Sequence, residues 1–135
     1  MEFIGIILDT NFFFIPIDFK IDIFEEFDRI IQTNYKIMTF PAIIEELKKL
    51  SAKKTSVSWK KRIQMALKIA EKCEIYDEST LQKENIDDFI LRIAKEKKWI
   101  VATNDKELKK RLKSQGIPII YLRQKSYLML EGSTF

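Results

Sequence analysis

The chain has 135 residues, of which 46% are hydrophobic, enough to bury the core of one domain, and we expect a single domain over residues 1–135. It has no histidine and one cysteine, Cys73, which excludes an internal disulfide, argues against zinc and indicates a buried apolar cysteine in a reducing cytoplasm. The net charge is +4, and the apolar run at residues 3–8 is too short for a signal peptide or a membrane span, so no membrane partner is expected.

The first part of the chain alternates short apolar runs with helical periodicity. The continuous apolar run at residues 3–8 predicts a buried strand. Asp22 and Glu25 form a capping box in front of a helix at residues 23–31, and a short strand is expected at residues 36–39. This alternation is typical of an α/β fold with a mostly parallel sheet.

The rest of the chain repeats the pattern with recognisable start and stop signals. Pro41 suits a first helical position, Asn85 suits an N-cap, and Gly116 suits the left-handed residue that ends a helix. Pro118 predicts that the strand containing it lies at a sheet edge. The expected elements are helices at residues 41–50, 59–72, 85–98 and 105–115, strands at residues 74–77, 99–103 and 117–122, and a tail from about residue 124.

Two aspartates follow expected strands. Asp9 ends the first strand, and Asp105 comes shortly after the strand at residues 99–103. Because ligands of an open α/β sheet bind beyond the carboxyl ends of its strands, both carboxylates are expected at that edge. Taken singly, Asp9 is equally consistent with an Asx turn, and Asp105 with a helix cap.

Adjacent glutamates on the helix at residues 41–50 face different ways. Glu46 falls beside the apolar stripe of that helix, whereas Glu45 lies on the opposite side. A carboxylate at the border of the core is costly to bury unless it is paired or binds a metal. We therefore expect Glu46 to be a site residue, with a salt bridge to a lysine as the alternative.

The doubled acid Asp87-Asp88 presents the same choice. Asp87 shares a helical face with the apolar residues Ile90 and Ala94, whereas Asp88 is on a half-solvated face. We expect Asp87 to be a metal ligand and Asp88 to be a second or water-mediated participant. Both acids lie in the first turn of a helix, where a negative charge is favourable without any function.

Four acids gathered in this way need a cation. Without histidine, the expected cofactor is one or two Mg²⁺ or Mn²⁺ ions, which prefer oxygen ligands. Such an ion activates water for hydrolysis of a phosphodiester, which predicts a metal-dependent nuclease. Its expected catalytic and metal-binding residues are Asp9, Glu46, Asp87 and Asp105, and the residues expected to orient them are Thr10, Asn11 and Thr103.

The basic residues are concentrated in two segments. Residues 48–62 carry seven cations and no acid, and a second group follows Asp105. Such segments bind phosphate backbones, and an exposed Trp59 would stack on an unpaired base, although each segment alone is as well explained as a solvated helix face. The residues expected to contact the nucleic acid are Lys53, Lys54, Trp59, Lys60, Lys61, Arg62, Lys106, Lys109 and Lys110.

In order and spacing, these acidic motifs resemble those of the PIN-domain ribonucleases. Residues 101–109 and 119–123 look most like the archaeal and eukaryotic branch associated with small-subunit ribosomal RNA processing, and archaeal proteins of this type are also labelled VapC-type toxins. The matching motifs are Asp9-Thr10-Asn11, Glu46-Leu47, Asp87 with Ile90 and Ala94, and Thr103-Asn104-Asp105.

The resemblance implies a three-layer α/β/α fold with about five parallel strands and endonucleolytic cleavage of RNA. It also implies a homodimer and an antitoxin or a ribosome-assembly partner. The main alternative is a non-catalytic RNA-binding module that keeps the acids as a structural cation site. A phosphotransfer receiver or a haloacid-type phosphatase fits less well, because the phosphatase motif needs an aspartate where Asn11 stands.

Overall fold

A six-stranded sheet forms the centre of the protein. The computed structural model describes residues 2–132. The strand order is β3-β2-β1-β4-β5-β6, in which the first five strands are parallel and β6 runs antiparallel to β5. The strands are β1 (Ile4–Leu8), β2 (Tyr35–Thr39), β3 (Glu74–Ile75), β4 (Ile100–Ala102), β5 (Ile119–Arg123) and β6 (Tyr127–Glu131).

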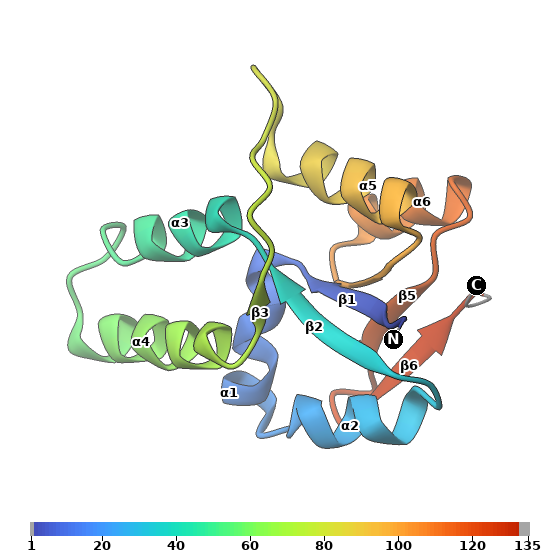
Figure 1. The fold of residues 1–135 in the computed structure, drawn as a ribbon. Helices are drawn as coiled ribbons and strands as arrows, with labels where there is room; N and C mark the ends of the chain where they lie inside the picture. The colour runs from blue at the N-terminus through green and yellow to red at the C-terminus, as the bar shows by residue number, and fades with distance from the viewer. Residues whose placement is uncertain (1, 133–135) are drawn as a thin grey trace.

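Helices cover both faces of this sheet, with α5 and α6 on one side and α1 and α2 on the other, while α3 and α4 form a hairpin that projects from the sheet (Figure 1). The expected α/β/α arrangement is therefore confirmed. The helices are the 3₁₀ helix η1 (Thr10–Phe14) and the α-helices α1 (Ile15–Phe19), α2 (Ile23–Ile30), α3 (Pro41–Leu50), α4 (Val57–Glu71), α5 (Ile86–Lys97) and α6 (Lys106–Ser114).

Of the region expected to be a tail from about residue 124, residues 127–131 are instead strand β6, which returns along β5 through a three-residue turn at residues 124–126, while residues 133–135 lie outside the described part of the chain. Gln124 and Lys125 both have positive φ values, 54° and 57°, and the N–H of Ser126 donates to the carbonyl of Arg123 at 3.1 Å. A turn of this kind is normally signalled by asparagine or glycine. Because glutamine and lysine are unusual in such a turn, the hairpin was not predicted from the sequence.

The prediction that Pro118 places the last strand at an edge is wrong, because β5 lies between β4 and β6. Pro118 immediately precedes β5, and its carbonyl accepts a hydrogen bond from the N–H of Val101 at 3.1 Å. The missing N–H of proline therefore costs the sheet no hydrogen bond within the strand.

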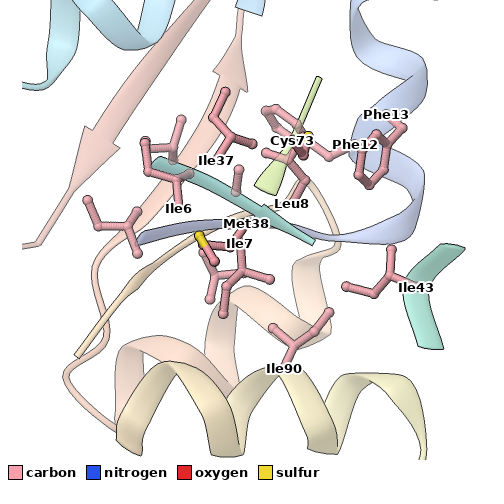
Figure 2. Packing of buried hydrophobic residues seen from close by; sticks show 14 of the residues in the cluster. Ile6, Ile7, Leu8, Phe12, Phe13, Ile37, Met38, Ile43, Cys73 and Ile90 are labelled. Carbon is pink, nitrogen blue, oxygen red and sulfur yellow. The ribbon is translucent and has the colours of Figure 1, made fainter. Parts of the chain in front are cut away.

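The core lies on both faces of β1. Figure 2 shows Ile7 on the side of the sheet that faces Ile90 of α5, with Ile6 and Leu8 on the other side. Cys73 is buried as expected, and burial raises the pKa of its thiol to about 12. Within residues 2–132, no helix is long and apolar enough to cross a membrane.

Candidate active site

The segment that follows β1 is shaped by Asp9. Its carboxylate accepts a hydrogen bond from the N–H of Thr10 at 2.8 Å, so Asp9 caps η1. The helix η1 itself was not predicted from the sequence. The backbone N–H of Asp9 donates to the carbonyl of Ala102 at 3.0 Å, which ties it to the end of β4. The carboxyl ends of β1 and β4 therefore meet as expected.

Thr103 joins the two strand-end aspartates. Its hydroxyl donates to Oδ2 of Asp9 at 2.9 Å and accepts from the N–H of Asp105 at 3.1 Å, and its side chain is fully buried. Asp105 in turn caps α6 by accepting from the N–H of Leu108 at 2.9 Å. One threonine thus sets the positions of both acids.

The other two residues expected to orient the acids do less. Thr10 acts through its backbone N–H, whereas its hydroxyl is buried with no hydrogen-bond partner among residues 2–132. Asn11 is exposed. Sequence analysis missed a role for Asn104, whose Oδ1 accepts from the N–H of Leu122 at 2.8 Å and so ties the loop to β5. The sequence signal for this role was the position of Asn104 between Thr103 and Asp105.

The acids interact electrostatically. Asp9 is 7% exposed, and burial raises the pKa of its carboxyl to about 6, helped by Asp87 and Asp105 and opposed by the Thr103 hydrogen bond. Burial also raises the pKa of Asp87, and the charges of Asp105 and Glu46 act in the same direction. Each carboxylate that ionises therefore makes it harder for its neighbours to do so.

Glu46 does not border the core as expected, because its side chain is exposed on α3. The buried face of α3 is centred on Ile43 and Leu47, and one residue before Leu47 lies about 100° around the helix. Glu46 and Glu45 both line a cavity of about 500 Å³ that reaches Ile86 at the start of α5. Glu46 thus faces the first turn that carries Asp87, although it is not buried.

Asp88 is engaged elsewhere, in an ion pair of 2.6 Å with Arg111 of α6. None of the four proposed acids, Asp9, Glu46, Asp87 and Asp105, is in an ion pair among residues 2–132. Within the same residues, no group of three or more acidic, cysteine or histidine side chains stands ready to hold a metal ion. The chemistry of the donors suits a hard cation, but the side chains must move to share one.

Two of the residues expected to bind nucleic acid, Trp59 and Arg62, make contacts within the protein that stabilise the fold. Trp59 is half-buried rather than exposed, and its indole N–H donates to the carbonyl of Leu50 at 2.8 Å. Arg62 pairs with Asp18 at 2.5 Å and lies over the ring of Phe14 at 4.1 Å. The Trp59 hydrogen bond joins α4 to the end of α3, and the Arg62 contacts hold α4 against η1 and α1.

Most of the expected lysines remain at the surface. In the α3–α4 hairpin, Lys53, Lys54, Lys60 and Lys61 are exposed, although Lys54 lies over the Trp59 ring at 4.7 Å. On α6, Lys106 and Lys110 are exposed, whereas Lys109 is half-buried over the ring of Tyr121 at 4.6 Å. The two basic segments belong to different parts of the molecule, the projecting hairpin and α6 (Figure 1).

Comparison with known proteins identifies the family. A family model described as PIN like domain matches residues 6–125. Ribonuclease VapC4 of Methanocaldococcus jannaschii is 36% identical over 128 residues, which cover 94% of this chain and 96% of that protein.

Solved structures agree with this match. The PIN domain endonuclease Utp24 aligns with a TM-score of 0.78 at 29% identity and covers 96% of this chain and 92% of that one. A domain of a functionally unknown protein from Methanocaldococcus jannaschii aligns with a TM-score of 0.62 at 21% identity, covering 88% and 91%, and shows the fold alone. The expected resemblance is therefore confirmed, and the chain belongs to the PIN-like domain family.

Proposed function

We propose that this protein is a Mg²⁺- or Mn²⁺-dependent endoribonuclease that hydrolyses phosphodiester bonds of RNA. The observation that carries the proposal is the group of carboxylates at the carboxyl edge of the sheet, in which Asp87 and Asp105 raise the pKa of the buried Asp9, and Asp105 and Glu46 raise the pKa of Asp87. Such an arrangement is unfavourable for the polypeptide alone. The names of the two relatives, a ribonuclease and an endonuclease, support the same activity.

The residues that would hold one or two ions are Asp9, Asp87 and Asp105, directly or through water, with Glu46 completing the set. When bound, such an ion supplies an activated water and neutralises charge on the phosphoryl oxygens. Glu46 and Asp105 are both exposed, but Asp105 caps α6, so Glu46 is the side chain better able to turn toward the buried Asp9. Asp88 is a weaker candidate because it is paired with Arg111.

Thr103 orients Asp9 for this role and favours its charged form. Its hydrogen bond lowers the pKa of Asp9 against the effect of burial. With a pKa of about 6, Asp9 is mostly ionised at neutral pH, as a metal ligand must be. Binding of the ion to Asp9 would lower this pKa further, so in the absence of histidine the proton released during hydrolysis would pass to another carboxylate of the site.

For the biological role, we propose processing of a ribosomal RNA precursor by a cytoplasmic homodimer, with a ribosome-assembly partner. The similarity to the Utp24 endonuclease over 96% of the chain supports this proposal. The 36% identity to VapC4 supports a second candidate, a VapC-type toxin ribonuclease with an antitoxin partner. A small antitoxin reading frame directly upstream would favour the toxin, and altered ribosomal RNA ends in cells carrying an Asp9 variant would favour processing.

The activity is tested with Asp9→Asn, Asp105→Asn and a matched control, Asp77→Asn, which removes an exposed carboxylate outside the site. We expect both site variants to lose cleavage of single-stranded RNA by about a thousandfold or more, because a bound metal contributes several kcal/mol to hydrolysis. The control should cleave like the wild type, chelation should stop cleavage, and Mn²⁺ should restore it. Full activity in either site variant, with contaminating nuclease excluded, would refute the assignment, and a non-catalytic RNA-binding module would show no metal-dependent cleavage at all.

A further inference from the structure

The ion pair between Arg111 and Asp88 connects two helices next to the acids. Helices α5 and α6 lie side by side on one face of the sheet (Figure 1). Nη2 of Arg111 donates to Oδ1 of Asp88 at 2.6 Å, and the two side chains are 42% and 45% exposed. Because Asp88 directly follows Asp87, the guanidinium is held beside the acidic edge.

Much of the hydrogen-bonding capacity of Arg111 is unused. A guanidinium has five N–H donors. Among residues 2–132, the side chain of Arg111 makes this one hydrogen bond, to one oxygen of Asp88. The pair is therefore not the two-pronged arrangement that a fully satisfied arginine and carboxylate form. Donors remain for a second anion, and the exposure of the side chain leaves them within reach of solvent.

The charge of the site favours such a contact. Four carboxylates repel an approaching phosphate, and the ion pair with Asp88, the neighbour of Asp87, places the positive charge of Arg111 next to them. Two other cations of α6 are engaged elsewhere: Lys109 lies over the Tyr121 ring at 4.6 Å, and Lys113 pairs with Glu131 at 2.6 Å. Arginine also matches phosphate geometry better than lysine does.

We propose that Arg111 binds a phosphate of the RNA beside Asp87, and that Asp88 is a positioning residue that holds the guanidinium there rather than a metal ligand. This inference rests on the proposed nuclease function. It assigns a substrate contact to a residue that the sequence analysis did not include among the RNA-binding residues. It also explains the doubled acid, because Asp87 and Asp88 then have different tasks.

The contact is tested by binding, without divalent ions, so that cleavage plays no part. Fluorescently labelled oligouridylate is titrated in chelator with the wild type, Arg111→Ala, Arg111→Lys and the control Lys113→Ala, which removes a paired cation from the same helix. Arg111→Ala should weaken binding roughly tenfold, as expected for one charge-assisted hydrogen bond, and reduce the salt slope by about 0.7. Arg111→Lys should fall between, and the control should match the wild type.

The role of Asp88 is tested by cleavage. Asp88→Asn keeps an acceptor for Arg111 and should retain most of the wild-type kcat, whereas Arg111→Ala should raise KM roughly tenfold with a smaller change in kcat. Asp88→Ala should add no further loss in the Arg111→Ala background, because the residue it positions is already absent. Circular dichroism of each variant excludes loss of fold as the cause.

The outcomes separate this inference from the proposed function. Equal binding by Arg111→Ala and Lys113→Ala would overturn the phosphate contact even if the wild type cleaves RNA. Loss of cleavage in Asp88→Asn with unchanged RNA binding would make Asp88 a ligand and overturn its positioning role. If the wild type cleaves no RNA, the nuclease proposal fails, while the binding titration still decides whether Arg111 contacts a phosphate.

Discussion

Two regions of the molecule place a carboxylate against a strand: the contact between α2 and β6, here called the flank, and the carboxyl edge of the sheet. The carboxylate of the flank lies beside a cation, whereas that of the carboxyl edge lies beside other acids. On the flank, Glu26 accepts from the N–H of Leu128 at 2.8 Å and pairs with Arg29 at 2.9 Å, and Arg29 donates to the carbonyl of Leu128 at 2.8 Å. These contacts lower the pKa of Glu26. At the carboxyl edge, burial and neighbouring acids raise the pKa of Asp9 to about 6.

This difference separates a structural carboxylate from a functional one. Glu26 and Arg29 satisfy outward-facing backbone groups of the edge strand β6, which also blocks pairing of β6 with another chain at that point. The polypeptide thus supplies a cation where a carboxylate serves stability. It supplies none to Asp9 among residues 2–132, which agrees with the proposed role of Asp9 in holding an ion.

The largest expected effect is on stability without metal. Because the folded-state pKa of Asp9 lies above the unfolded value of 3.8, the folded protein binds more protons between these values, and its stability falls as pH rises through that window. Asp9→Asn should remove this cost and raise the unfolding free energy at pH 7 by up to about 3 kcal/mol in chelator. Urea denaturation of both proteins between pH 4 and 7 measures this difference, and a stability advantage of Asp9→Asn that does not shrink at lower pH would contradict the assignment.

Divalent ions should cancel most of the stability advantage of Asp9→Asn. Mn²⁺ at about 100 times its dissociation constant should stabilise the wild type by about 2.7 kcal/mol, because it binds only the folded site. Asp9→Asn should gain much less. Thermal unfolding with and without Mn²⁺ gives the comparison, in which equal gains in both proteins would place the ion elsewhere.

Loss of the Thr103 hydroxyl should reduce activity without removing an acid. Thr103→Val takes away the hydrogen bond that orients Asp9 and lowers its pKa, so we expect about 10- to 100-fold slower cleavage and an acidic limb shifted to higher pH. Thr39→Val is the matched control, since the Thr39 hydroxyl is buried without a partner among residues 2–132. A pH–rate profile of both variants would expose a purely structural role if the two curves coincide.

The smallest expected effect is on the flank. Glu26→Ala leaves the N–H of Leu128 without its acceptor and should cost about 1–2 kcal/mol of unfolding free energy, with cleavage unchanged. Removal of the exposed Glu71 on α4 serves as the control. Reduced cleavage in a folded Glu26→Ala protein would mean that the two regions are not independent.

Local signals were sufficient for most element boundaries. Asp22 and Asn85 cap α2 and α5 through hydrogen bonds of 2.8 to 3.1 Å, and Gly116 has a φ of 71° after α6, as predicted. The hairpin before β6 was missed because Gln124 and Lys125 adopt positive φ against their preference, which only the pairing of β5 and β6 stabilises. Trp59 was expected to be exposed, but it is half-buried against the carbonyl of Leu50. Because Leu50 belongs to the preceding helix, the pattern of the helix that contains Trp59 does not reveal this contact.

By itself, the sequence determined the alternation of strands and helices, the acids that follow β1 and β4, and hence the edge of the sheet where they meet. These depend on periodicity, capping and the common direction of parallel strands, which act over short stretches of chain. Tertiary structure alone decided that Asp9 is buried and hydrogen-bonded to Thr103, that Glu46 is exposed, and that Asp88 faces Arg111. Burial and ion pairing depend on which distant side chains pack together, and no local pattern specifies them.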